Sequence, residues 1–239
     1  MAFEKIILSI PHSVPASNFD KWKEWCRSAV RKEHDKWTDW HTDTIFGNLS
    51  EGNKGKVEAV IFNRSRYEVD VERLVGDPME KIGQGIVYTG LKEGGDGLRE
   101  VTDSDRVDCT RAYMGHWMEV ASLCHGNGLL IDCHSFPTDY SGSPNAEGER
   151  VDVCIGLNDD RSNPGEDVIN VIKSRFEEAG YTVGINSPFS NSFSPIPGFP
   201  SVMIELRKGI YMDEGTLKLL SSAYKVNQLL NGIYRELLI

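Results

Sequence analysis

Short apolar runs alternate along this chain with longer segments in which apolar residues recur every three or four positions. Six of the runs are typical of buried strands: residues 6–10, 56–62, 129–133, 151–157, 181–185 and 201–206. Four periodic segments predict helices: residues 19–37, 105–124, 165–179 and 213–238. This alternation predicts an α/β protein of three layers, α/β/α, with a mixed and largely parallel sheet.

Three segments show neither the apolar run of a strand nor the three-to-four-residue spacing of a helix. Residues 75–105 and 186–200 are rich in Gly, Pro and Ser, and residues 138–150 form a polar, glycine-containing stretch. Long irregular segments inside a compact domain often form lids or binding loops, so we expect the first two to border a functional site. No linker composition divides the chain, and residues 1–239 are predicted to form a single domain.

The charge and the cysteine content indicate which kinds of partner and which compartment to expect. The formal net charge is -10, and the Lys and Arg residues are scattered, which argues against a surface for nucleic acid or an anionic membrane. The five cysteines include no CxxC pair and favour a reducing compartment. The chain contains no apolar run of about 18 residues, and its first apolar segment is short for a secretion signal. We therefore expect a cytoplasmic protein whose partner is a small molecule; the sequence does not indicate an oligomeric state.

Polar residues with catalytic potential stand at the ends of three predicted strands. His12 follows the first run, His134 follows LLIDC, and Glu205 lies within SVMIELR. In an open α/β sheet ligands bind beyond the carboxyl ends of the strands. Each residue alone has an ordinary structural explanation, such as a hydrogen-bonded loop histidine or a surface ion pair. Together, two imidazoles and a carboxylate at one edge could form an open zinc site with its general base.

The segments IPHS, LIDCHSF and VMIELRKGIYMDE resemble signature segments of the N-formylglutamate amidohydrolase family. That family is similar in turn to the zinc carboxypeptidases and has a phosphorylase/hydrolase-like fold. The resemblance implies one catalytic Zn²⁺ ion, with His12 and His134 as metal ligands. It also implies that Glu205 acts as general base and proton shuttle.

The third zinc ligand is less directly indicated. Carboxypeptidases carry a glutamate three residues after the first histidine, and Pro15 occupies that position here. The segment TDWH resembles a family segment in which an aspartate recurs. The resemblance therefore implies Asp39 as the third ligand, with Asp43 and His41 as alternatives.

Substrate-binding residues are implied by the segment FNRSRYEVDVERL. It resembles the family stretch whose arginines bind the carboxylates of the substrate, and the matching residues are Arg66 and Arg73. A guanidinium suits a carboxylate because two parallel N–H donors meet two oxygens. This chain carries Glu72 beside Arg73 where the family usually has asparagine, which leaves the exact substrate open.

The resemblance implies hydrolysis of the amide bond of N-formyl-L-glutamate or a related small acidic N-acyl amino acid. A metallopeptidase acting on small peptides or cell-wall fragments would use the same residues in a wider groove. A non-catalytic binding protein with the same fold, having lost the metal, is the alternative from another class.

Overall fold

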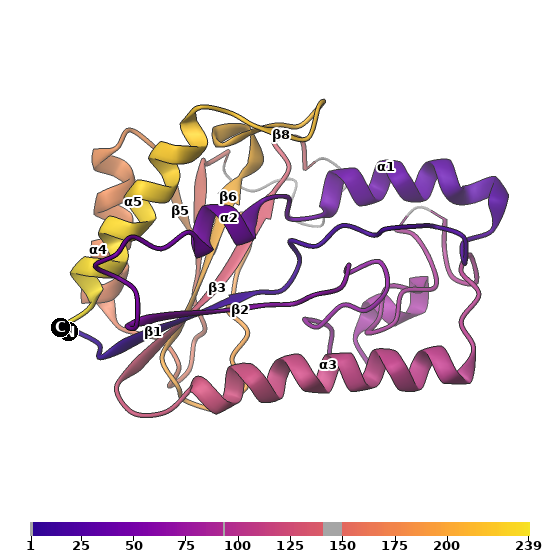
Figure 1. Cartoon of the computed structure of the whole chain (residues 1–239), viewed down its shortest axis with the longest axis horizontal. Coiled ribbons are helices and arrows are strands. Elements are labelled where there is room, and N and C mark those ends of the chain that lie inside the picture. Colours follow the sequence, from indigo (N-terminus) through magenta and orange to yellow (C-terminus); the bar gives the residue numbers. More distant parts are fainter. Residues whose placement is uncertain (1, 93, 141–149) are drawn as a thin grey trace.

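The computed structural model of the chain describes residues 2–92, 94–140 and 150–239 and is built around a six-stranded sheet (Figure 1). The strand order is β2-β1-β3-β6-β4-β5. Neighbouring strands pair in parallel except at β4, which runs antiparallel to β6. The sheet is thus mixed and largely parallel, as predicted. Its strands are β1 (Lys5–Ile10), β2 (Val57–Ile61), β3 (Gly128–Phe136), β4 (Val153–Gly156), β5 (Val183–Ile185) and β6 (Ser201–Arg207).

Helices cover both faces of this sheet, which confirms the three-layer fold (Figure 1). On one face, buried residues such as Leu8 and Ile131 share a core with α2 (Thr42–Gly47), α4 (Glu166–Glu178) and α5 (Ser222–Leu237). On the other face, Ile7 and Leu130 pack with Trp117 of α3 (Asp103–Leu123). Because side chains alternate along a strand, neighbouring residues of β1 and β3 supply both cores.

Helix α3 begins where its sequence provides a capping box. Thr102 accepts a hydrogen bond from the Asp105 backbone N–H, and the Asp105 carboxylate accepts one from the Thr102 N–H. This pairing satisfies backbone donors that the first helical turn leaves without partners. The observed start lies within two residues of the predicted one.

Two predicted helices were too long at their N-terminal ends. Helix α1 spans only Arg27–Trp37, after the short 3-10 helix η1 (Glu24–Cys26). Phe19 and Trp22 instead lie outside a helix, where they pack with Tyr67 and three other large side chains. Before α5, the hairpin of β7 (Met212–Asp213) and β8 (Lys218–Leu219) replaces the predicted first turns.

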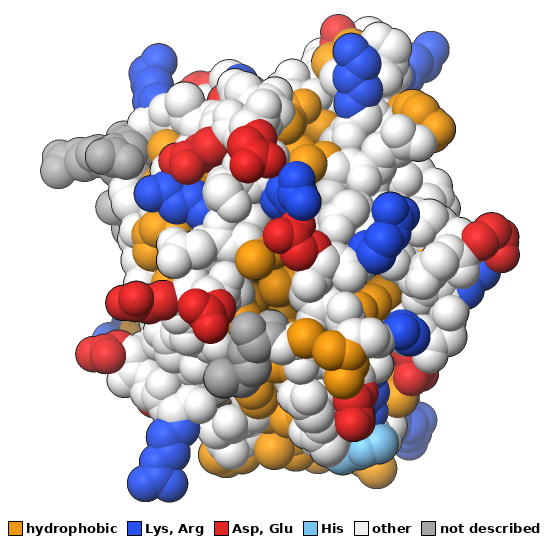
Figure 2. All heavy atoms as spheres, turned by 90° about the vertical axis from the view of Figure 1, so that its left-hand side faces the viewer, with side chains coloured by type: hydrophobic (Ala, Val, Ile, Leu, Met, Phe, Trp, Pro, Cys, Tyr) orange, Lys and Arg blue, Asp and Glu red, His pale blue; other side chains and the backbone are white. Residues whose placement is uncertain are grey.

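Short 3-10 helices occur in the loops that connect these elements. The 75–105 segment contains the 3-10 helix η2 (Pro78–Ile82), and η3 (Lys208–Ile210) follows β6. Most of the predicted polar loop 138–150 lies outside the described residues. On the face that carries α4 and α5, acidic and basic side chains are interspersed (Figure 2). Within the described residues, no helix is long and apolar enough to cross a membrane.

Candidate active site

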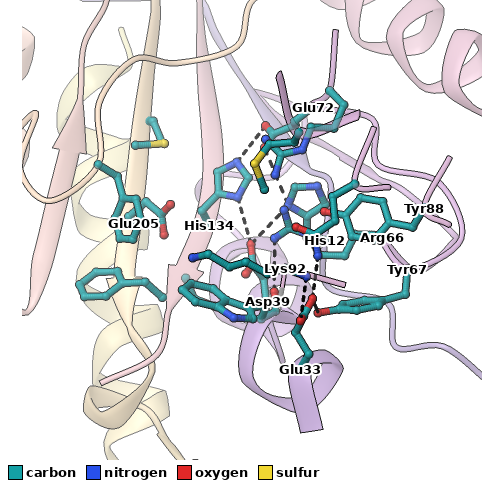
Figure 3. A pocket seen from close by; sticks show the side chains of 18 residues that line it. His12, Glu33, Asp39, Arg66, Tyr67, Glu72, Tyr88, Lys92, His134 and Glu205 are labelled. Atoms are coloured by element: carbon teal, nitrogen blue, oxygen red, sulfur yellow. Dashed lines mark hydrogen bonds and ion pairs between the residues drawn. The ribbon is translucent and has the colours of Figure 1, made fainter. Parts of the chain in front are cut away.

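The three residues expected at the centre of the site line one cavity of about 410 Å³ (Figure 3). His12 lies two residues beyond β1, and the β3–β6 register places His134 directly opposite Glu205. Cys133 belongs to the core on the opposite face of the sheet, as the alternation of strand side chains requires. Strand ends far apart in sequence therefore meet at one edge of the sheet.

The His12 ring is held so that one nitrogen faces the cavity without a partner. Its Nε2 lies 2.9 Å from Asp70 Oδ1. Its Nδ1 is buried and makes no hydrogen bond; it lies 3.7 Å from Asp39 Oδ2 and 3.8 Å from Glu72 Oε2. When Nε2 donates its proton to Asp70, Nδ1 keeps a lone pair that points between two carboxylates. Metal-binding histidines are commonly oriented in this way.

The His134 ring is contacted by carboxylates through both nitrogens. Its Nδ1 lies 3.0 Å from Asp39 Oδ2, and its Nε2 lies 2.9 Å from Glu72 Oε1 and 3.1 Å from Asp132 Oδ1. Burial lowers the pKa of this imidazole, but the surrounding carboxylates outweigh burial and raise its pKa well above the ordinary value. The site therefore strongly favours a positive charge at this position.

The residues fit a divalent cation. His12, Glu72 and His134 each offer one ligand atom, and these atoms lie within 4.8 Å of one another. Two nitrogens and a carboxylate oxygen are a donor set that zinc accepts. Asp39 also touches both imidazoles, so the structure brings together all three residues expected to bind metal and adds Glu72. The alternatives His41 and Asp43 are not among the lining residues of this cavity.

Asp70 organises the loop that follows β2. Its fully buried carboxylate binds His12 and also accepts hydrogen bonds from the Glu72 N–H, Arg66 Nη2 and the Tyr88 hydroxyl, at 2.9–3.0 Å. Although burial raises the pKa of Asp70, His12 and Arg66 hold it well below the usual value. This single carboxylate positions the His12 imidazole, an arginine and the backbone of Glu72.

Both arginines expected to bind substrate line the cavity. Arg66 is paired with Asp70 and donates to the Trp37 carbonyl at 3.3 Å. Arg73 is held more loosely, with Nε 3.6 Å from Asp70 Oδ2 and Nη1 3.9 Å from Asp77 Oδ2. Arg64, the first arginine of the same segment, donates to Asp108 at 2.6 Å outside the cavity.

Glu205 lies on the opposite side of His134 from Arg66 (Figure 3). Its Oε2 is buried and has no hydrogen-bond partner. Burial raises the pKa of Glu205 to about 8, with Asp39 and Glu72 adding to the effect and His134 opposing it. A carboxylate whose pKa lies near neutrality can both accept and return a proton.

The sequence did not single out several further lining residues. Phe136 and Met203 lie two positions from His134 and Glu205 on the same strands, so strand alternation could have identified them. No periodic signal marks the loop residues. The lining residues not yet named as such, from loops, α1 and β3, are Glu33, Trp37, Tyr67, Met79, Gln84, Tyr88, Lys92, Ser135 and Phe189.

Comparisons with known proteins identify the fold and the family. The N-formylglutamate amidohydrolase of Ralstonia eutropha JMP134 superposes with a TM-score of 0.67 at 18% sequence identity, over 98% of this chain and 92% of that one. A gene product of Agrobacterium tumefaciens gives a TM-score of 0.66 at 18% identity, over 97% of this chain and 91% of its own. At this identity both establish the fold. A comparison with curated protein sequences gives no match. Residues 4–212 match the profile of the N-formylglutamate amidohydrolases, and the chain therefore belongs to that family.

Proposed function

We propose that this protein is a zinc-dependent amidohydrolase that cleaves the amide bond of an N-formyl or short N-acyl amino acid. The observation that carries the proposal is the unpartnered, buried Nδ1 of His12 facing Asp39 and Glu72 beside His134. The family profile supports the amidohydrolase class, and the similarity to the Ralstonia enzyme supports a substrate of the N-formylglutamate kind.

His12 Nδ1, His134 Nε2 and one oxygen of Glu72 would hold the metal, since these three residues form the compact ligand group. Asp70 then orients His12, and Asp39 orients His134 through Nδ1 at 3.0 Å. Each ligand imidazole thus has a carboxylate on its other nitrogen. Asp39, expected from the sequence to bind zinc, is the competing third ligand.

A bound zinc ion would supply a Lewis acid that polarises the substrate carbonyl and acidifies water. Glu205 accepts a proton from the attacking water as the oxygen adds to the acyl carbon. It then delivers that proton to the amine nitrogen as the C–N bond breaks, which gives a carboxylic acid and a free amino acid. Arg73 binds the α-carboxylate of the substrate, and Arg66 supports the same loop.

The size of the cavity favours a small metabolite over a peptide. Its volume of about 410 Å³ lies at the lower end of small-molecule sites. Met79, Gln84, Tyr88 and Lys92 from the irregular 75–105 segment form part of its wall.

The proposal is tested by assaying the purified protein for release of primary amine from N-formyl amino acids. Activity should disappear with a strong chelator and return with zinc. No hydrolysis of any N-formyl or N-acetyl amino acid, with zinc present, would contradict the proposal and support a non-catalytic binding protein.

A further inference from the structure

Lys208 is a buried cation that the proposed reaction does not use. It lies in η3, just after the strand that carries Glu205, and is 1% exposed. It is the only buried lysine among the residues that the structure describes. Removing an ammonium group from water costs free energy unless protein groups compensate for it. The groups around Lys208 therefore indicate its role.

The ammonium of Lys208 binds the end of α1. Its Nζ donates a hydrogen bond to the Lys36 carbonyl at 2.6 Å. Lys36 lies in the last turn of α1, where carbonyl groups lack a partner within the helix and a positive charge is favourable. Asp39 follows shortly after this turn. Lys208 thus fixes the backbone just before the Asp39 carboxylate.

Tyr211 binds the chain on the other side of Asp39. Its hydroxyl donates to the Trp40 carbonyl at 2.8 Å, and its side chain is fully buried. Between these two contacts, the Asp39 N–H donates to the His12 carbonyl at 3.1 Å. Hydrogen bonds from Lys208, from Tyr211 and from its own N–H therefore hold the backbone on both sides of Asp39.

The position of this turn matters because Asp39 contacts both imidazoles of the site. Its Oδ2 lies 3.0 Å from His134 Nδ1 and 3.7 Å from His12 Nδ1. An aspartate side chain is short, so both distances depend on where its backbone lies. A shift of the turn would withdraw the carboxylate from one imidazole or from both.

The charge of Lys208 also acts on Asp39. Burial lowers the pKa of Lys208 to about 8, and the Asp39 carboxylate opposes this shift. Asp39 is itself 2% exposed, so its charge also needs compensation within the protein. The ammonium offsets part of the negative charge that Asp39 brings to the buried site.

We propose that Lys208 and Tyr211 are positioning residues of the metal site, which hold the turn at residues 36–40 so that Asp39 reaches both imidazoles. Neither side chain lines the cavity, so both act through Asp39 and not on the substrate. This inference rests on the proposed function, in which Asp39 orients a histidine that binds the metal.

The first test measures the zinc affinity of the purified protein by competition with a chromophoric chelator. Lys208→Met nearly keeps the length of the side chain but removes its charge and its hydrogen bond, and should weaken zinc binding by about tenfold. The matched control Lys36→Met removes a nearby lysine charge but keeps the Lys36 carbonyl, and should change the affinity by less than about twofold. An unchanged affinity in Lys208→Met, or equal losses in both variants, would overturn the inference.

A double-mutant cycle shows whether Lys208 acts through Asp39. In an Asp39→Ala background, Lys208→Met should change the zinc affinity by less than about twofold, because the carboxylate that Lys208 positions is already absent. A role of Lys208 in general stability alone would give the same loss in both backgrounds, and that result would contradict the inference.

Tyr211→Phe tests the same inference with a smaller change in structure. It removes only the hydroxyl that binds the Trp40 carbonyl, and should weaken zinc binding by about threefold. This loss should also disappear in the Asp39→Ala background. The variant provides the test if Lys208→Met does not fold, and an unchanged zinc affinity would contradict the inference.

If the wild type binds no zinc, the proposed function fails and the metal-free protein still tests the contact. Urea unfolding of Lys208→Met, Asp39→Ala and the double variant gives their transition midpoints. We expect the double variant to lose less than the sum of the two single losses, because each charge compensates the other. Additive losses would overturn the inference.

Discussion

The two walls of the cavity are held in place by different means. Residues on β3 and β6 are positioned by a parallel hydrogen-bond ladder in the middle of the sheet, where all nine β3 residues are buried. The loop wall has no ladder, and residues 62–77 contain no helix or strand. There the Asp70 carboxylate, with four hydrogen-bond partners, fixes the geometry.

The two walls also carry different parts of the proposed site. The sheet wall carries the proposed base, and the loop wall carries the arginines and Glu72. A rigid sheet can hold one catalytic arrangement while a loop changes around it, which is how one fold serves several substrates. Glu72, in place of the usual asparagine, is such a change.

The largest loss of activity is expected for Glu205→Gln, a substitution on the sheet wall. The variant keeps the shape of the side chain but loses the proton acceptor, so kcat should fall by about 10²–10⁴-fold. KM and metal content should change little. Steady-state kinetics with the N-formyl amino acid that the wild type hydrolyses fastest, together with elemental analysis, check this, and a loss of metal would instead make Glu205 a ligand.

A second pair of variants decides which carboxylate binds the metal. Glu72→Gln should weaken zinc binding by more than about 100-fold, and Asp39→Asn by about 10–100-fold, the usual cost of losing a group that orients a ligand. Competition with a chromophoric chelator measures both affinities. The opposite order would restore Asp39 as the third ligand.

On the loop wall, Arg73→Ala should lower kcat/KM by about 10²-fold, because the substrate carboxylate loses its charged partner. Arg64→Ala is the matched control, since Arg64 binds Asp108 outside the cavity. Equal effects of the two variants would exclude Arg73 from substrate binding.

The smallest predicted effect is on the pH dependence of stability, and it concerns a buried histidine on α3. His116 on α3 packs against Phe62 and Trp117, and burial lowers its pKa to about 4. The unfolded chain therefore binds a proton near pH 6.5 while the folded chain does not, so the free energy of unfolding falls as pH drops from about 6.5 to 4.

His116→Gln should reduce that pH dependence, and His125→Gln, at an exposed histidine, should not. Urea unfolding at pH 7 and pH 5 gives the comparison. Identical pH dependence in the wild type and His116→Gln would contradict the account.

The sequence predicted the sheet wall better than the loop wall, for physical reasons. Buried strands appear in the sequence as short apolar runs. His134 and Glu205 could be placed because each lies at the end of such a run or within it. Asp39 was reached only through the family resemblance, because nothing in a short polar segment indicates which strand end it meets.

Glu72 looked like a departure from the family pattern, and only the fold shows that it contacts His134 at 2.9 Å. The two helix starts were misplaced because Phe19 packs in a tertiary core, and Asp213 pairs with Lys218 in a hairpin, which local periodicity does not reveal.

The most direct test of the central claim is the metal content of the purified protein, measured by elemental analysis beside His134→Ala and Glu205→Gln. The account predicts about one zinc per chain in the wild type and in Glu205→Gln, and a large loss in His134→Ala. No metal in the wild type, even after zinc is supplied, would contradict a metal-dependent hydrolase.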